Sequence, residues 1–358
     1  MPELTTSKVA KYLSALLKEP VTVRSLTPLG GAADVKEYGY GMPVRVEYES
    51  GSGRRIAVLH TLSAGPFGHE HMADRAGELL WQHRAFNQLP RHIRSLDVGG
   101  ILSDGDLKPL GTVDEFFLLT EYAEGREYAE DLERIRELGC ATAGDFARAD
   151  ALCDYLVEIH AVRRDDPPLY SRRMRELVGG NECIMGLADS YPRHSAISAG
   201  VLERIEQLCV HWRWRSKDYS HRLRQVHGDF HPWNILFSSP TEFALLDRSR
   251  GEFGDPADDV TCLTLNYLFF SLQRSGRLEG AFEQLFRRFW DRYLDRTGDG
   301  EMLRVAAPFC AFRGLVMASP VWYPALPDQV RRALIQFILA VLNSESFDPA
   351  LVNSYCDV

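Results

Sequence analysis

Long hydrophobic runs are missing from the sequence. Its most apolar stretches, LTLNYLFFSL from Leu263 and ALIQFILAVL from Ala333, are about half as long as the ~20 residues that a membrane span requires. The N-terminal segment, MPELTTSKVAKYLSALLKEP, also lacks the apolar core and the small-residue cleavage site of a secretory signal. We therefore expect both apolar stretches to form buried helices in a cytoplasmic protein that does not bind membranes.

Cysteine and positive charge are also in short supply. The seven cysteines are an odd number, are scattered and include no CxxC pair, which argues against a disulfide framework or a zinc site and predicts reduced, mostly buried thiols. Lys and Arg together number 41 against 50 Asp and Glu, giving a formal net charge of -9. An acidic chain has no long-range attraction for phosphate backbones, so nucleic acid is not expected as a partner.

The remaining composition is that of an ordinary globular protein. Hydrophobic residues make up 45% and charged residues 25% of the 358, with no low-complexity block. Since this length exceeds the usual size of one domain, two packed lobes are expected. The oligomeric state cannot be deduced from these properties.

The first third of the sequence alternates strand-like pieces with turns. β-Branched residues and period-two alternation predict strands over 21–29, 44–50 and 56–62, with glycines between them. Apolar spacing near 3.6 then predicts a helix over 69–89, which Pro90 ends. A small antiparallel sheet followed by one helix is therefore expected.

The rest of the sequence is predominantly helical. Strand signals return at 98–104 and 116–125, and nearly everything from about Asp145 onward has helical periodicity. The change in composition predicts an α+β protein with a sheet-rich lobe over 1–122 and a larger helical lobe over 123–358. A ligand is expected in the cleft between two such lobes.

The stretch VHGDFHPWNILF, which begins at Val226, interrupts the helical half with polar side chains. Asp229 and Asn234 lie in it, and Asp247 follows at the end of FALLD. NILF and FALLD are short apolar strands joined by SSPTE, so a hairpin would bring Asn234 and Asp247 together beside Asp229. Two oxygen ligands suit a Mg²⁺ ion that takes its other ligands from water and phosphates, which leaves Asp229 available as a base.

Two other interpretations of this stretch are open. His227, Asp229 and His231, at alternate positions, could bind a metal that activates a hydrolytic water, although no other His or Cys cluster completes such a site. Asp229 or Asn234 alone could instead cap a helix or order a turn. This last interpretation does not explain the three oxygen-bearing side chains together.

HGDFHPWN resembles the catalytic loop of the aminoglycoside phosphotransferase and choline kinase superfamily, which shares the protein-kinase-like fold. It matches the kinase pattern HRDxxxxN, in which Asp is the base and Asn binds a metal. The resemblance implies a bilobal fold, Asp229 as the catalytic base, Asn234 and Asp247 as Mg²⁺ ligands, and ATP or GTP as co-substrate. His227 is expected to order the loop by hydrogen bonding, and His231 to lie near the substrate.

LLDRSRGEFGDPADDV resembles the segment that follows this loop in the family. Asp247 matches the metal-binding Asp of the kinase DFG element, although Arg248 and Ser249 replace Phe and Gly. Arg250 falls where phosphotransferases of this kind commonly carry an arginine. The resemblance gives mainly structural roles to two further acidic residues, Asp255 and Asp259.

The resemblance also implies a nucleotide site in the N-terminal lobe. Gly30 and Gly31 lie in PLGGAADVKEYGYG, where a glycine-rich loop would cover the phosphates, although glycine pairs between strands are most often plain turns. FFLLTEYAEG resembles the hinge between the lobes. Main-chain groups of Glu121 and Ala123 would there bind the edge of the adenine ring.

His60 stands where the resemblance calls for a lysine. AVLH aligns with the kinase VAIK, and Glu78 in the following helix would be the partner of His60. An imidazole has an ordinary pKa of about 6.5, so it carries only part of a positive charge near neutral pH. If His60 replaces the lysine, activity should fall as the pH rises; otherwise His60 is a polar strand residue, and Mg²⁺ and backbone N–H groups hold the phosphates.

The predicted function is that of a small-molecule kinase. It would move the γ-phosphoryl group of ATP or GTP to a hydroxyl of an aminoglycoside-like, choline-like or sugar-like acceptor. The missing lysine leaves open a second class, a catalytically impaired nucleotide-binding pseudokinase or scaffold. A protein kinase is disfavoured because the loop has HGD in place of HRD and no APE element follows Asp247.

Overall fold

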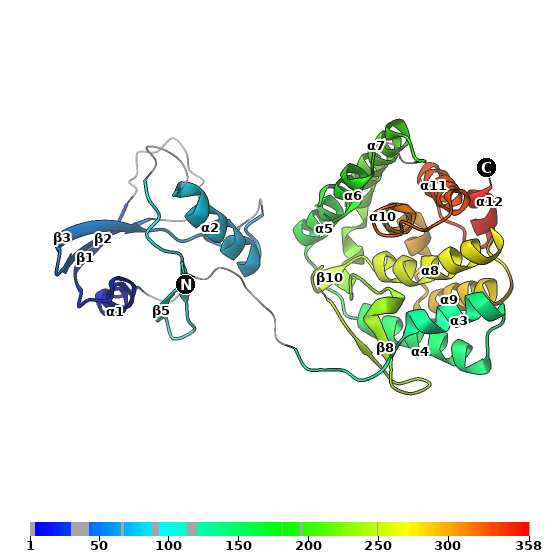
Figure 1. The fold of residues 1–358 in the computed structure, drawn as a ribbon, viewed down its shortest axis with the longest axis horizontal. Helices are drawn as coiled ribbons and strands as arrows, with labels where there is room; N and C mark the ends of the chain where they lie inside the picture. Colours follow the sequence, from blue (N-terminus) through cyan, green and yellow to red (C-terminus); the bar gives the residue numbers. More distant parts are fainter. Residues whose placement is uncertain are drawn as a thin grey trace. The chain divides into compact units, whose positions relative to one another are not determined.

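The computed structural model of the chain describes residues 4–29, 43–65, 68–87, 93–112, 120–180, 182–193, 196–248 and 250–357. It divides into two compact units, Met1–Thr120 and Glu121–Val358. The first unit contains a three-stranded sheet, and the second contains most of the helices (Figure 1).

The first unit is built on an antiparallel sheet of order β1-β2-β3. Its first elements are α1 (Thr6–Leu17), β1 (Thr22–Pro28), β2 (Val44–Ser50) and β3 (Gly53–Leu59). Strand β2 alternates strictly, since Val46 and Tyr48 are buried and Arg45 and Glu47 form an ion pair. The buried face of β2 packs with Val9 and Leu13 of α1, which form a small separate core.

Helix α2 (Met72–Phe86) and the strand pair β4 (Gly99–Ile101) and β5 (Leu107–Pro109) complete the described part of this unit. Near the start of α2, the N–H of His71 donates to Asp74 Oδ2 at 2.8 Å. This bond satisfies one of the donors that a helix N-terminus leaves without an intrahelical partner.

The pattern-based predictions for the first third are largely confirmed. Strands β1, β2 and β3 and helix α2 lie where alternation and 3.6-residue spacing predict them. β3 ends at Leu59, so His60 follows the strand instead of lying inside it. The strand predicted over 116–125 falls partly outside the described residues, and its described part, from Thr120, forms no strand.

The second unit is mostly helical, with short strands around the stretch that contains Asp229. Its helices are α3 (Tyr128–Leu138), α4 (Ala143–His160), α5 (Pro167–Gly179), α6 (Ile184–Ser190), α7 (Ala199–Arg215), α8 (Ala257–Ser275), α9 (Gly280–Thr297), α10 (Ala307–Ala318), α11 (Asp328–Asn343) and α12 (Val352–Cys356). Its strands are β6 (Arg126–Glu127), β7 (Arg224–Gln225), β8 (Ile235–Phe237), β9 (Phe243–Leu245) and β10 (Phe253–Gly254), and its 3-10 turns are η1 (Ser216–Arg222), η2 (Pro232–Asn234), η3 (Gly300–Arg304) and η4 (Pro349–Leu351).

Helix α8 is the centre of the second unit. It packs against α3, α9, α10 and α11 and lies between α9 and α10 in Figure 1. Every residue from Asp259 to Leu272 is buried, as expected of a helix that is apolar around most of its circumference. The hydroxyls of Thr261 and Thr264 donate to carbonyls of the preceding turn at 2.7 Å, so these buried polar groups are satisfied within the helix.

Both apolar stretches predicted to be buried helices are confirmed, one in α8 and the other in α11. None of the helices in the described residues combines the length and apolarity needed to cross a membrane. All seven cysteines are free, and five of them are buried.

A buried ion-pair network anchors the start of α8. Asp255 accepts two hydrogen bonds from Arg222, at 2.9 and 3.0 Å, and a third from the Tyr170 hydroxyl at 2.8 Å. Arg222 also donates to Asp299 at 2.6 Å. Since each buried charge has a partner of opposite sign, the network is compatible with burial, and the structural role expected for Asp255 is confirmed.

Candidate active site

Residues 226–234 form a loop between β7 and β8, and a buried carboxylate fixes its backbone. The N–H groups of His227 and Gly228 donate to the two oxygens of Asp259, at 2.8 and 2.7 Å. His160 Nε2 lies 3.1 Å from Asp259 Oδ2. Burial raises the pKa of the Asp259 carboxyl, but the bonds from His160 and the two backbone N–H groups outweigh it and keep that pKa below its usual range.

The backbone conformation of the loop depends on Gly228. Its φ of +86° lies in the left-handed region, and a Cβ built there would lie 3.2 Å from Arg250 Cβ. The residues that flank Gly228 are also bonded to each other: the N–H of Asp229 donates to His227 Nδ1 at 3.3 Å. This bond confirms the ordering role expected for His227. Arg248 donates to the carbonyl of Val226 through Nε and Nη2, at 3.1 and 2.9 Å, so the residue that replaces Phe holds the first residue of the loop.

A hairpin brings Asn234 and Asp247 to the same end of two strands, as the sequence predicts. β8 pairs with β9 in antiparallel register, and the N–H of Leu246 donates to the Asn234 carbonyl at 2.9 Å. Asp247 follows with a φ of +50°, a conformation that Asp tolerates better than most residues. The Asn234 side-chain amide donates to the carbonyl of Asp229 at 3.1 Å, which ties the hairpin to the loop.

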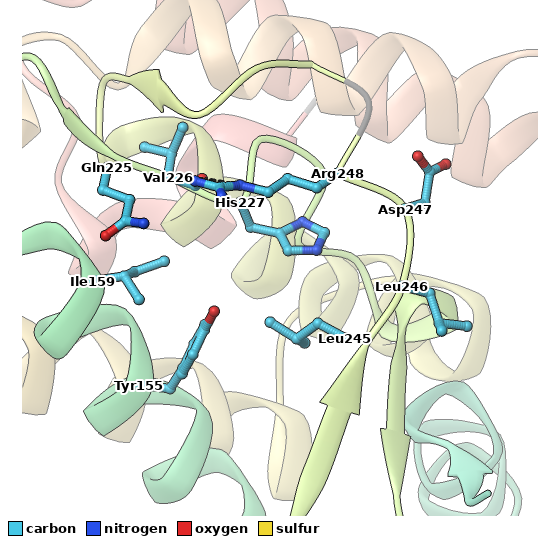
Figure 2. Close-up of a pocket in the computed structure, with 9 residues that line it drawn as sticks. All are labelled: Tyr155, Ile159, Gln225, Val226, His227, Leu245, Leu246, Asp247 and Arg248. Carbon is cyan, nitrogen blue, oxygen red and sulfur yellow. Dashed lines mark hydrogen bonds between the residues drawn. The ribbon is translucent and has the colours of Figure 1, made fainter. Parts of the chain in front are cut away.

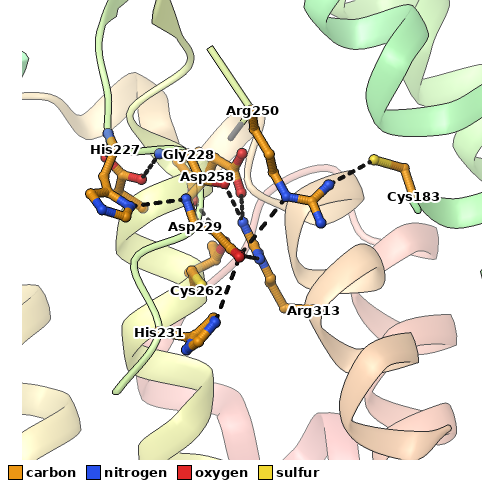
Figure 3. Close-up of polar contacts among 12 residues, drawn as sticks. Cys183, His227, Gly228, Asp229, His231, Arg250, Asp258, Cys262 and Arg313 are labelled. Atoms are coloured by element: carbon orange, nitrogen blue, oxygen red, sulfur yellow. Dashed lines mark hydrogen bonds and ion pairs between the residues drawn. The ribbon is translucent and has the colours of Figure 1, made fainter. Parts of the chain in front are cut away.

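Two arginines and a histidine surround the carboxylate of Asp229 (Figure 3). Arg313 Nη1 donates to Asp229 Oδ1 at 2.5 Å, Arg250 Nε lies 3.9 Å from the same oxygen, and His231 Nε2 lies 3.6 Å from Oδ2. Burial raises the pKa of the Asp229 carboxyl, but Arg313, His231 and Arg250 outweigh it and hold that pKa below its usual range. Asp229 is therefore ionised at neutral pH.

Arg313 and Asp258 also lie at this loop, and neither is predicted from the sequence as a site residue. Arg313 lies in α10 and donates to Asp258 Oδ1 at 2.6 Å and to the Gly228 carbonyl at 2.9 Å. One signal could have identified it, because Arg313 is the only charged residue in the apolar sequence of α10, APFCAFRGLVMA. A lone charge on a buried helix requires a buried partner.

A small pocket lies beside the loop, between α4 and the end of β9 (Figure 2). Its volume is about 180 Å³, which is less than the ~300 Å³ typical of small-molecule sites. Tyr155 and Ile159 face the loop across it, and Asp247 lies at its edge with the carboxylate directed away from Leu245. This pocket alone is therefore too small to hold a nucleotide.

Of the side chains predicted to bind nucleotide, those of His60 and Glu78 lie in the described part of the first unit. Gly30 and Gly31 lie outside the described residues. His60 is exposed, and no described residue forms a hydrogen bond or ion pair with it. Glu78 Oε2 lies 2.7 Å from His69 Nε2, so the expected pairing of His60 with Glu78 is wrong: the buried His69 takes this partner.

The residues expected to form the hinge begin the second unit. Glu121 is exposed and Ala123 is half-buried, in a segment without regular secondary structure. Among the described residues none forms a main-chain hydrogen bond with Glu121 or Ala123, as the hinge interpretation requires.

The alternative metal site receives no support. Within the described ranges, no three His, Cys, Asp or Glu side chains are grouped so that they could hold a metal ion. His227 Nδ1 is occupied by the N–H of Asp229. The interpretation of His227, Asp229 and His231 as three metal ligands is therefore set aside.

A loop that presents an ionised Asp, followed by an Asn and a second Asp on a hairpin, matches the order of these residues in phosphotransferase sites of the kinase type. The family comparison agrees, since a model described as "Phosphotransferase enzyme family" matches residues 69–297, more than half of the chain. The chain belongs to this family. A search of curated proteins gives no match.

Several solved structures are similar to the chain at low sequence identity. A glucosamine kinase has a TM-score of 0.36 and 14% identity, with 99% of this chain and 96% of that chain covered. An ethanolamine kinase of Plasmodium vivax has a TM-score of 0.35 and 14% identity, with 93% and 80% covered. The ADP-bound aminoglycoside phosphotransferase APH(2'')-Ib has a TM-score of 0.31 and 14% identity, with 95% and 97% covered.

The family assignment confirms three predictions made from the sequence. The resemblance to the aminoglycoside phosphotransferase and choline kinase superfamily is correct, and the fold class is the α+β protein-kinase-like class. The protein is an enzyme, a phosphotransferase. This result favours the enzyme over the non-catalytic scaffold that the missing lysine leaves open.

Proposed function

We propose that the protein transfers the γ-phosphoryl group of ATP or GTP to a hydroxyl group of a small molecule, with Asp229 as the base. The observation that carries this proposal is the ionised carboxylate of Asp229. It is presented by a loop whose backbone donates two hydrogen bonds to the buried carboxylate of Asp259. In phosphoryl transfer the enzyme acts mainly by positioning the reactants and neutralising charge. A rigid, ionised carboxylate supports that role. The seven free cysteines support a cytoplasmic location.

The residues around Asp229 favour a polar acceptor. Within the part of the chain that the structure describes, three buried ring or guanidinium atoms of residues beside Asp229 have no hydrogen-bond partner: His231 Nδ1, Arg250 Nε and Arg313 Nε. Buried polar atoms without partners are uncommon, and at a reaction site a ligand can satisfy them. A hydroxylated acceptor would bring both donors and acceptors to these atoms while its reacting hydroxyl faces Asp229.

Asn234 and Asp247 fit a Mg²⁺ ion. No described residue donates a hydrogen bond to Asn234 Oδ1 or to the Asp247 carboxylate, although the hairpin places these residues at one end of β8 and β9. Mg²⁺ prefers oxygen ligands and takes few of them from the protein, with the rest from water and phosphates. Bound there, the ion would neutralise charge on the phosphates.

The nucleotide-binding residues remain part of the proposal. Backbone N–H groups of a glycine pair, the side chain at position 60 and main-chain groups of the hinge would hold the triphosphate and the base. Since Glu78 pairs with His69, it would reach the nucleotide only after this pair is exchanged. The proposed residues are Gly30, Gly31, His60, Glu78, Glu121 and Ala123.

An acceptor screen tests the proposed function. Purified protein is mixed with ATP or GTP and Mg²⁺, and release of the nucleoside diphosphate is followed with four separate acceptor classes: aminoglycosides, choline-like amino alcohols, macrolides and sugars. We expect one class to stimulate release well above the level without acceptor. Nucleotide binding without stimulation by any class would instead support the non-catalytic alternative.

Replacing Asp247 with Ala is expected to lower kcat by about 100-fold and to raise the Mg²⁺ concentration needed for half-maximal activity. The reason is that the change removes one of the two side chains at the hairpin end whose oxygens would bind Mg²⁺. The measurement is turnover over a series of Mg²⁺ concentrations. The matched control is Glu242→Ala, because Glu242 is an exposed carboxylate at the turn of the same hairpin. An unchanged Mg²⁺ dependence in the Asp247 variant would remove this residue from the metal site.

A further inference from the structure

Arg313 joins the loop of Asp229 to a helix that lies far away in the sequence. Its guanidinium donates to three acceptors: Asp229 Oδ1 at 2.5 Å, the Gly228 carbonyl at 2.9 Å and Asp258 Oδ1 at 2.6 Å (Figure 3). Two of these acceptors belong to the loop, and the third is at the start of α8. The side chain is 5% exposed, so it faces these acceptors and not solvent.

The surroundings of Arg313 keep it in one orientation. Asp258 supplies a second carboxylate, so the buried guanidinium keeps a partner even when Asp229 accepts a proton. The ring of Phe312 lies 4.5 Å from Arg313 Cζ and 4.8 Å from Arg250 Cζ, so one aromatic ring contacts both arginines. Two charged acceptors and a ring leave the guanidinium little freedom to turn.

The two oxygens of Asp229 are therefore not equivalent. Oδ1 accepts the bond from Arg313 and lies near Arg250, whereas the neighbour of Oδ2 is His231, at 3.6 Å. A hydroxyl that approaches Asp229 can pair with Oδ2 without displacing an arginine. Rotation of the carboxylate about its Cβ–Cγ bond would break the short bond to Arg313, so the free oxygen keeps its direction.

We propose that Arg313 is a positioning residue of the phosphotransferase reaction, which holds Asp229 Oδ1 and thereby directs Oδ2 toward the acceptor hydroxyl. The inference rests on the proposed function, because it assigns a task to Asp229. Arg313 acts through Asp229 and through the Gly228 carbonyl, and it need not touch either substrate. Removing the hydrogen bonds from Arg313 to the loop is therefore expected to lower kcat more than it weakens substrate binding.

The test compares Arg313→Met and Arg313→Lys with a control at a second buried arginine. Arg331 in α11 is equally buried but donates to backbone carbonyls of Ala318 and Tyr323, so Arg331→Met removes a buried guanidinium without touching the loop. For Arg313→Met we expect kcat to fall about 100-fold with both KM values within about 3-fold of wild type. Arg313→Lys, which keeps the charge, should recover part of the loss.

Thermal unfolding separates this effect from simple instability. We expect Arg331→Met to lower the Tm as much as Arg313→Met but to keep a wild-type kcat per folded molecule. Added methylguanidine should restore turnover to an Arg313→Ala variant and leave the turnover of Arg331→Ala unchanged. The inference is overturned if the two Met variants have equal kcat per folded molecule, or if Arg313→Lys is no better than Arg313→Met.

Failure of this inference can be told apart from failure of the proposed function. If Asp229→Asn keeps its turnover, Asp229 is not the base and the proposed function falls. If Asp229→Asn is inactive while Arg313→Met matches Arg331→Met, only the positioning role of Arg313 is wrong.

Discussion

Replacing Asp229 with Asn is expected to lower kcat by about 10²- to 10⁴-fold, the range that a general base usually contributes, with nucleotide affinity close to that of wild type. The amide has the size of the carboxylate but cannot accept a proton from the acceptor hydroxyl at neutral pH. It also places a neutral group beside Arg313 and Arg250, which hold the wild-type carboxyl ionised. Turnover is measured as Mg²⁺-dependent release of nucleoside diphosphate, and affinity by calorimetric titration of the nucleotide.

The control for this variant is Asp150→Asn. Asp150 lies in α4 and accepts two hydrogen bonds from Arg288, both at 2.7 Å, so this change also removes a carboxylate from an arginine pair. It is outside the loop and the hairpin, and a wild-type kcat is expected. Turnover by Asp229→Asn at the level of Asp150→Asn would show that Asp229 is not the base.

Local spacing explains why part of the site could be predicted from the sequence. Asn234 and Asp247 flank two short strands joined by a turn, and a hairpin of that length has few alternative registers. Asp229 lies five residues before Asn234 in the loop, where the Asn234 side chain bonds its carbonyl. These relations depend on neighbours in the chain, so the pattern of apolar and polar residues was sufficient to predict them.

The rest of the site depends on contacts between distant segments. Arg313 reaches Asp229 only because α10 packs against α8, and no periodicity in either helix specifies this contact. In the same way, His160, the last residue of α4, contacts Asp259 from a distant part of the sequence. Helix patterns predict which face of a helix is buried, but not which residue of another helix it meets.

The incorrect prediction of the partner of Glu78 has the same physical origin, a contact between segments that the sequence pattern does not specify. Analogy with the kinase Lys–Glu pair predicts His60 as the partner of Glu78, and such a pair requires a strand residue to face a helix residue. In the structure β3 ends before His60, and His69, just ahead of α2, is buried and has a carboxylate within reach. A buried imidazole gains more from such a bond than an exposed one, since burial without a partner costs free energy.

Replacing Asp259 with Ala is expected to lower the free energy of unfolding by about 3–5 kcal/mol, the usual cost of breaking a buried charged pair. The change leaves the N–H groups of His227 and Gly228 without their acceptor and removes the contact at His160 Nε2, so that His160 keeps only the Tyr293 hydroxyl. The loop should then lose its fixed backbone, so kcat should fall as well. Urea denaturation gives the free energy, and turnover per folded molecule gives the effect on the loop.

Asp154→Ala is the matched control, because Asp154 also pairs with two arginines, Arg292 and Arg296, but its side chain is 41% exposed. Exposed pairs of this kind contribute about 1 kcal/mol or less, so a similar loss in both variants would contradict a special role for Asp259. The dependence on pH gives a second check. Since the folded pKa of Asp259 lies below its unfolded value, its contribution is present above the unfolded pKa of about 3.9 and is lost as the pH falls through the folded pKa. The difference in stability between wild type and Asp259→Ala should therefore shrink as the pH falls below the unfolded pKa of about 3.9.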